Sequence, residues 1–255
     1  MSDPDRAGRE VDLTVVNAQE RPDLADRADE ETASTHEEWQ VHGDVSNHYW
    51  GSLYDAYPEF QLVLHDQTGD IVLGEGNTIP CSWDETIEGL PTGIDEVIER
   101  GFAEDFEANN LSALNVRIVP GNEGQGHSRL LLTAMRELAA AQGFANVIAP
   151  VLPNWKHRYP LIPIEEYAYW NRDDGRPFDP WIRVHHRLGA DTLAVAPRSR
   201  LISGTVADWE EWTGLEFPES GDYLLPGGLT PMRVDHDRDL GVYWEPNVWM
   251  RHRAA

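Results

Sequence analysis

The chain has a single cysteine, Cys81, and a single lysine, Lys156, among its 255 residues. One cysteine excludes an intrachain disulfide and a cysteine-rich metal site. Basic residues are also scarce, because 20 lysines and arginines stand against 45 aspartates and glutamates, a formal net charge of −25. Such a chain repels nucleic acids and anionic membranes at long range, so neither is an expected partner. Without a signal peptide or a run of about 18 apolar residues, we expect a cytoplasmic location.

Ten histidines raise the question of a metal site. His185 and His186 are adjacent rather than four residues apart, and the triplet Asp235-His236-Asp237 has no matching partner in the sequence. Tetrahedral metal sites need several ligands at compatible spacing. We therefore expect no metal.

Apolar patterning predicts an α/β fold of alternating strands and helices. Residues of the set AVILMFWYC make up 40% of the chain and charged residues 25%, which is typical of a folded protein. Apolar alternation and helical spacing give the expected order. The expected strands cover 11–17, 60–66, 71–79, 111–119, 145–151, 192–195 and 201–206. One or two helices are expected within 22–57, and another follows Ser128 and ends near Gly143. The other expected helices cover 94–109, 180–188 and 207–212.

A glycine-rich loop at residues 121–128 joins an expected strand to an expected helix. Free N–H groups at the start of a helix bind anions, and a diphosphate is the natural guest. The sequence lacks the Gly-Lys-Ser/Thr of a Walker A loop, and Arg129 stands where a Rossmann fingerprint needs its third glycine. The alternative is a tight turn in which the glycines only satisfy backbone geometry.

Residues 115–120 and 123–128, followed by Leu131 and Leu132, resemble motif A of the GNAT acyltransferases. The order of elements from Val11 to about Val206 fits the same family. The resemblance implies an α/β GNAT fold, with a mixed, mostly antiparallel sheet flanked by helices, and acyl-CoA, acetyl-CoA first, as co-substrate. It assigns Ile118 and Val119 to the pantetheine arm and the following residues to the diphosphate: Gly124, Gln125, Gly126, His127, Ser128 and Arg129.

Two positions of this loop depart from the family pattern. Ser128 replaces a glycine or alanine, and Glu123 replaces a glutamine or arginine. A carboxylate beside a diphosphate is repulsive, so we expect Glu123 to turn to solvent or to pair with Arg129.

The segment Val184–Ala190 is similar to the GNAT segment in which a tyrosine protonates the departing thiolate. The resemblance places His185 in that role, and histidine can carry a proton to sulfur or take one from an amine. A surface or capping role is the alternative for this histidine pair. Glu166 and Tyr167 are further candidates for acid–base catalysis. Trp181 and Arg183 are candidates for the acceptor pocket, in which Arg183 would bind a carboxylate of the substrate. A structural ion pair is the alternative for Arg183.

A minimal GNAT domain would end before residue 207, so the resemblance implies three parts. These are a loose tail over 1–10, a GNAT-like domain over 11–206 and an aromatic-rich C-terminal extension over 207–255 that packs on it. Segments around Asp179, Glu210, Pro218 and Glu245 are similar to an extended GNAT subgroup fused to carbon-nitrogen hydrolases.

We therefore expect an acyltransferase that moves an acyl group from acyl-CoA to the amine of a small polar metabolite, by direct attack of the amine. One alternative is a GNAT-fold enzyme that uses a carrier-protein or other acyl thioester, for transfer or decarboxylation. A second is a degenerate GNAT domain that binds a ligand or partner without catalysis. A carrier protein and a homodimer stay open as partners.

Overall fold

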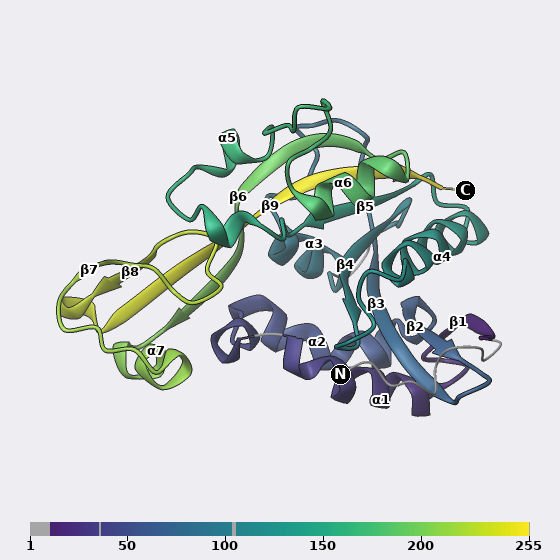
Figure 1. The fold of residues 1–255 in the computed structure, drawn as a ribbon, viewed down its shortest axis with the longest axis horizontal. Helices are drawn as coiled ribbons and strands as arrows, with labels where there is room; N and C mark the ends of the chain where they lie inside the picture. Colours follow the sequence, from purple (N-terminus) through teal and green to yellow (C-terminus); the bar gives the residue numbers. More distant parts are fainter. Residues whose placement is uncertain (1–10, 36, 104–105, 255) are drawn as a thin grey trace.

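A nine-stranded sheet forms the centre of the computed structural model, which describes residues 11–35, 37–103 and 106–254 (Figure 1). The predicted tail over 1–10 lies outside the described residues. The strands are β1 (Leu13–Asn17), β2 (Gln61–Asp66), β3 (Ile71–Cys81), β4 (Asn110–Ile118), β5 (Asn146–Val151), β6 (Asp191–Gly204), β7 (Gly221–Tyr223), β8 (Met232–Asp235) and β9 (Leu240–Arg253).

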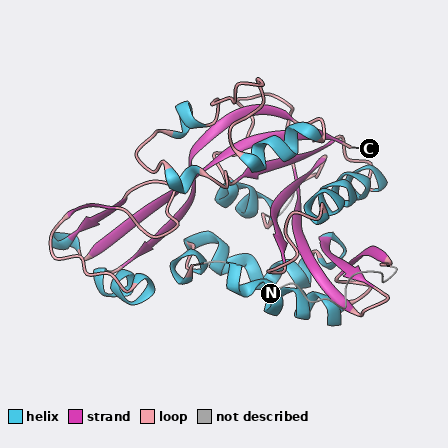
Figure 2. Ribbon diagram, viewed as in Figure 1, coloured by secondary structure: helices cyan, strands magenta, loops and turns pink. Residues whose placement is uncertain are grey.

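Helices flank this sheet, as Figure 2 shows in cyan against the magenta strands. They are α1 (Pro22–Thr32), α2 (Asp44–Ala56), α3 (Ile94–Gly101), α4 (His127–Ala141), α5 (Ile164–Tyr167), α6 (Pro180–Arg187) and α7 (Val206–Thr213). Short 3-10 turns cover Ala33–Thr35, Glu38–Val41, Pro58–Phe60, Lys156–Arg158 and His236–Arg238. Within the described residues, no helix has the length and apolar character needed to cross a bilayer.

The strands follow the order β1-β2-β3-β4-β5-β9-β8-β7, and β6 pairs with β9. Among the strands of the described residues, the β4–β5 pair alone is parallel, whereas the other pairs are antiparallel. This arrangement confirms the predicted mixed, mostly antiparallel sheet with flanking helices.

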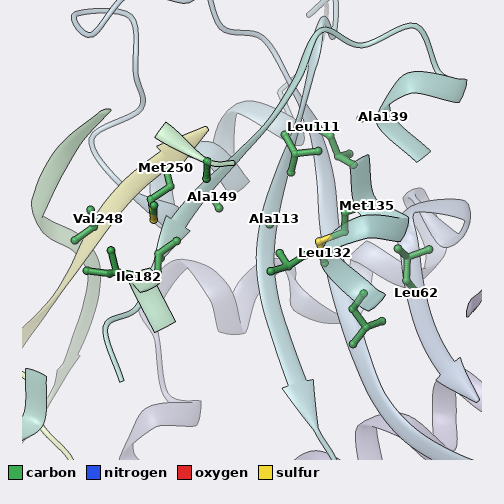
Figure 3. Packing of buried hydrophobic residues seen from close by; sticks show 14 of the residues in the cluster. Leu62, Leu111, Ala113, Leu132, Met135, Ala139, Ala149, Ile182, Val248 and Met250 are labelled. Atoms are coloured by element: carbon green, nitrogen blue, oxygen red, sulfur yellow. The ribbon is translucent and has the colours of Figure 1, made fainter. Parts of the chain in front are cut away.

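Both faces of the sheet are buried near β2 and β3. Leu62 and Leu64 pack with Met135 of α4 in the main core cluster (Figure 3), whereas Val63, between them, packs with Leu24 of α1. Successive side chains of a strand point to opposite faces, so one strand serves both layers. This explains why every residue of β2 is buried.

The C-terminal residues contribute a strand to the central sheet, and the division at residue 207 stays a prediction. Strand β9 lies inside the sheet, paired with β5 over Val248–Arg253 and with β6 over Gly241–Arg251. The sequence did not predict this strand, because Pro246 interrupts the segment. It lies opposite the register shift between Ala196 and Arg200 of β6, where the ladder is interrupted and a proline can be accommodated.

The aromatic residues of the C-terminal region build a second lobe, at the left in Figure 1, from α7, β7, β8 and the distal parts of β6 and β9. Its core contains Trp209, Phe217 and Tyr243. Trp39, from the N-terminal half of the chain, completes this core with its ring centroid 4.8 Å from that of Tyr243. The aromatic clustering predicted for this region is therefore present.

Candidate active site

The parallel strands β4 and β5 separate after two residue pairs. They pair only at Leu111 with Val147 and at Ser112 with Ile148, after which β4 keeps only β3 as its partner and β5 keeps only β9. A strand that loses its neighbour presents unpaired backbone N–H and C=O groups along that edge. The separation therefore opens a wedge with hydrogen-bonding groups on one wall.

A cavity of about 450 Å³ occupies this wedge. Residues 113–117 of β4 and 149–152 at the end of β5 form its walls. Residues of α1, α2 and the intervening turns close one side, while α6, β6 and β9 close the other. The volume lies in the range of small-molecule sites.

The glycine loop follows β4 directly and leads into α4. Gly121, Gly124 and Gly126 have φ values of 87°, 75° and 86°, which only glycine adopts without strain. A Cβ atom at Gly124 or Gly126 would meet no atom within 4 Å. Gly126 precedes α4 without a side-chain cap, so the first turn of the helix offers N–H groups to an anion.

The predicted diphosphate residues all lie on this loop or on the first turn of α4. Gly124, Gln125, Gly126 and Arg129 are exposed, whereas Ser128 is half-buried and His127 is buried. The carboxylate of Glu123 is exposed and accepts a hydrogen bond of 2.9 Å from the N–H of Gly121. Of the two expected arrangements, Glu123 thus adopts the one that faces solvent.

Ile118 and Val119, predicted to contact pantetheine, differ in what their backbones can offer. Val119 donates its N–H to the carbonyl of Leu73 at 3.0 Å, and its carbonyl accepts from the N–H of Asn122 at 3.1 Å. Both groups therefore have partners within the chain, and the contact of Val119 with pantetheine stays a prediction. Because backbone groups alternate between the two edges of a strand, Ile118 and Val116 face the wedge instead.

Helix α6 brings His185 and Trp181 to the cavity. The carboxylate of Asp179 accepts from the N–H groups of Trp181 (2.9 Å) and Ile182 (3.2 Å), so it caps the helix as its Asp-Pro sequence predicts. His185 and Trp181 both line the cavity, with their rings in edge contact at a centroid distance of 4.6 Å.

His185 is buried and presents one ring nitrogen without a protein partner. Its Nδ1 lies 2.8 Å from Nε2 of His252, whereas its Nε2 has no hydrogen-bond partner within the described part of the chain. Burial lowers the pKa of His185 well below its usual 6.5, and the neighbouring His252 and His186 act in the same direction. The ring is therefore neutral near pH 7 and able to accept or donate one proton.

Three predicted residues lie elsewhere. Tyr167 is buried, donates its hydroxyl to Asp179 at 2.9 Å, and has a raised pKa because of burial. Glu166 is exposed on α5, and Arg183 donates to the carbonyls of Pro177 (2.7 Å) and Phe178 (3.0 Å). None of the three lines the cavity, so the acid–base roles of Tyr167 and Glu166 and the substrate contact of Arg183 stay predictions.

Two charged pairs at the cavity had no clear signal in the sequence. Arg117 of β4 pairs with buried Glu75 and lies 3.2 Å from Asp29 of α1. On the other side, Arg200 lies 3.8 Å from buried Glu245, whose pKa burial raises. Each pair joins residues more than 40 positions apart, which only the fold brings together.

Asn247 is a further site residue that sequence reasoning missed. It lines the cavity, is 2% exposed, and its Oδ1 has no hydrogen-bond partner among the described residues. A buried polar atom without a partner is unfavourable unless a ligand or water completes it. The segment Glu245-Pro246-Asn247 could have signalled this site, because two polar residues flank a proline within an otherwise apolar and aromatic run.

No family model matches the chain. A curated relative, the arginine N-acetyltransferase avaD of Aspergillus versicolor, is 31% identical over 238 residues, which cover 82% of this chain and 81% of the relative. Similar solved structures include the loading GNATL domain of CurA from Lyngbya majuscula, with 17% identity, coverage of 96% of this chain and 98% of that one, and a TM-score of 0.58. The GphF GNAT-like decarboxylase in complex with isobutyryl-CoA also has 17% identity and a TM-score of 0.58, with coverage of 95% and 100%. At these identities the two structures share the fold.

Proposed function

The chain belongs to the GNAT acyltransferase superfamily, and from this premise we propose that it transfers an acyl group from acyl-CoA to the amine of a small, polar, amino-acid-like metabolite. The observation that carries the proposal is the cavity between β4 and β5, with the glycine loop after one wall and His185 on the other side. The arrangement supports a two-substrate site with a donor arm and an acceptor pocket.

The donor fits the loop and the edge of β4. The N–H groups of the loop and of the first turn of α4 bind the diphosphate, and Arg129 adds a positive charge nearby. The pantetheine arm follows the free edge of β4, where Val116 and Ile118 offer backbone groups. This path directs the thioester toward the interior of the cavity and His185.

The acceptor is supported by the charges of the cavity and by the relative. Asp29 contributes a negative group and Arg117 and Arg200 contribute positive ones, while the Glu245 carboxyl group lies 3.8 Å from Arg200. A zwitterion can pair with both signs without leaving a net charge buried, which is otherwise costly. Because the curated relative is an arginine N-acetyltransferase, arginine is the first acceptor to test and acetyl-CoA the first donor.

The chemistry is direct transfer. The neutral amine attacks the thioester carbon, the C–N bond forms and the C–S bond breaks, and the leaving thiolate receives a proton. His185 can take the proton of the amine and return it to sulfur. A covalent enzyme intermediate on Cys81 is disfavoured, because this thiol is fully buried and burial raises its pKa to about 12.

The test is a transfer assay with acetyl-CoA and a panel of amino acids, in which free CoA thiol and the acylated product are both measured. We expect acylated product with a cationic amino acid, and a loss of roughly 10²-fold or more in kcat for His185→Phe. His186→Gln is the matched control, since His186 is the next residue of α6 and hydrogen-bonds Thr192 at 3.0 Å. Release of carbon dioxide from malonyl-CoA without transfer, or no binding of any acyl-CoA, would overturn the proposal.

A further inference from the structure

We propose that His252 is a positioning residue that holds His185, a residue of the cavity lining, in the tautomer with a lone pair on Nε2, the ring nitrogen that has no partner among the described residues. The proposal rests on the proposed function for the role of His185 in transfer. His252 lies on β9, in the region expected from the sequence to be an extension outside the catalytic domain.

The contact between the two rings is short and enclosed. Nδ1 of His185 and Nε2 of His252 are 2.8 Å apart, and the two residues are 2% and 1% exposed. The pairing of β9 with β5 fixes the backbone of His252, which lies opposite Val147.

A single hydrogen atom lies between the two neutral rings, so two arrangements exist. In the first, Nδ1–H of His185 donates to His252, and Nε2 of His185 carries a lone pair. In the second, Nε2–H of His252 donates to His185, whose own Nε2 then carries hydrogen. Only the first arrangement can accept a proton from an attacking amine.

The proton transfer proposed for His185 uses the first arrangement. Nε2 of His185 takes one proton from the amine nitrogen as the C–N bond forms, and His185 becomes cationic. Its Nδ1–H bond to His252 then becomes charge-assisted and stronger. When the C–S bond breaks, Nε2–H passes its proton to the thiolate, so the amine has lost one proton, sulfur has gained one, and His185 is neutral again.

The surroundings of the pair disfavour a permanent charge. Arg136 of α4, whose Nε donates to the carbonyl of Arg253 at 3.0 Å, lowers the pKa of His252. His186 of α6 lowers the pKa of His185. Trp181 contacts His185 with an uncharged ring. Neither histidine ring is hydrogen-bonded to a carboxylate in the described residues, so a neutral imidazole does the orienting that an aspartate does in a Ser-His-Asp triad.

Nitrogen NMR of histidine-labelled protein reads the tautomer without any assay of activity. We expect hydrogen on Nδ1 and none on Nε2 of His185 in the wild type, and a changed ratio in His252→Phe. Hydrogen on Nε2 of His185 in the wild type would overturn the proposal. A wild type that transfers no acyl group would refute the proposed function instead, while the spectrum still decides the tautomer.

Kinetics separate positioning from folding. His252→Phe should lower kcat at least about tenfold, while KM for acetyl-CoA stays within about twofold, because the lost group acts through the proton-transfer residue. His252→Gln, whose amide oxygen can accept near the position of Nε2, should recover kcat to within about threefold of the wild type. Unchanged kcat and an unchanged pH profile in His252→Phe would contradict the proposal. If this variant does not fold, the wild-type spectrum and His252→Gln decide.

Discussion

Gly126→Ala tests the glycine loop as the site of the donor diphosphate. Gly126 has φ of 86° and immediately precedes α4, at the point where the proposed diphosphate approaches the backbone. Gly143, just beyond the other end of the same helix, has φ of 76°. A Cβ atom would meet no atom within 4 Å at either position, so Gly143→Ala is a matched control for backbone strain.

The two variants should lose similar stability but differ in binding. A left-handed conformation costs an alanine about 1–2 kcal/mol, so both should lower the free energy of unfolding by about this amount. We expect only the methyl group of Gly126→Ala to obstruct the proposed diphosphate, because Gly126 lies in the glycine loop and Gly143 lies beyond the opposite end of α4. Loss of one hydrogen bond to a charged group costs about 1.5–3 kcal/mol, which corresponds to at least about tenfold in Kd.

Thermal denaturation and calorimetric titration with acetyl-CoA measure the two effects separately. At a ligand concentration of about 100 times the wild-type Kd, binding adds about 2.7 kcal/mol to the stability of the wild type. A tenfold weaker Gly126→Ala should gain only about 1.4 kcal/mol at that concentration. Gly143→Ala should keep the full gain.

Equal binding by Gly126→Ala and wild type would refute the loop as the diphosphate site. Equal loss of binding in Gly126→Ala and Gly143→Ala would also refute it, because the effect would then come from the stability of α4 and not from a local contact.

Three further predictions concern the neighbouring residues. Glu123→Gln should change the Kd of acetyl-CoA by less than about threefold, because the Glu123 carboxylate is exposed and hydrogen-bonded to Gly121. A tenfold gain in affinity, measured by calorimetry, would instead place that carboxylate at the second phosphate. Tyr167→Phe should lower the free energy of unfolding by about 1.5–3 kcal/mol, because the hydrogen bond to Asp179 is lost, and should leave kcat unchanged. A lower kcat with an unchanged free energy of unfolding would support a catalytic role for Tyr167. Urea denaturation should show the free energy of unfolding falling by up to roughly 3 kcal/mol as the pH drops from about 6.5 to about 4. In this range unfolded His252 binds a proton, whereas folded His252, with its pKa lowered to about 4, does not. A constant free energy of unfolding would contradict a buried neutral ring.

Local signals in the sequence were sufficient for much of the fold. Alternating apolar residues predicted β2 and β3, the glycine pattern predicted the loop before α4, and the Asp179-Pro180 dipeptide predicted the start of α6. Each of these depends on residues close in the chain. The helix expected over 94–109 instead ends at Gly101, where a Cβ would lie 2.3 Å from a side-chain carbon of Ile79.

Part of the site was also within reach of the sequence. The loop residues and His185 follow motifs whose spacing is local, and both motifs lie next to the wedge or line its cavity. Membership of the subgroup fused to carbon-nitrogen hydrolases stays a prediction, as do the acyl group and the acceptor.

The tertiary structure alone decided what surrounds those motifs. His252 reaches His185 across 67 positions, and Arg200 donates to the carbonyl of Gln40 across 160. The first contact involves β9, which carries His252 and lies in the sheet between β5 and β6, and the second involves β6, which pairs with β9. Strand pairing between distant segments has no local pattern beyond apolar alternation, and Pro246 interrupts even that pattern. The sequence therefore determined the motifs, and the long-range pairing of β9 decided which groups complete the cavity.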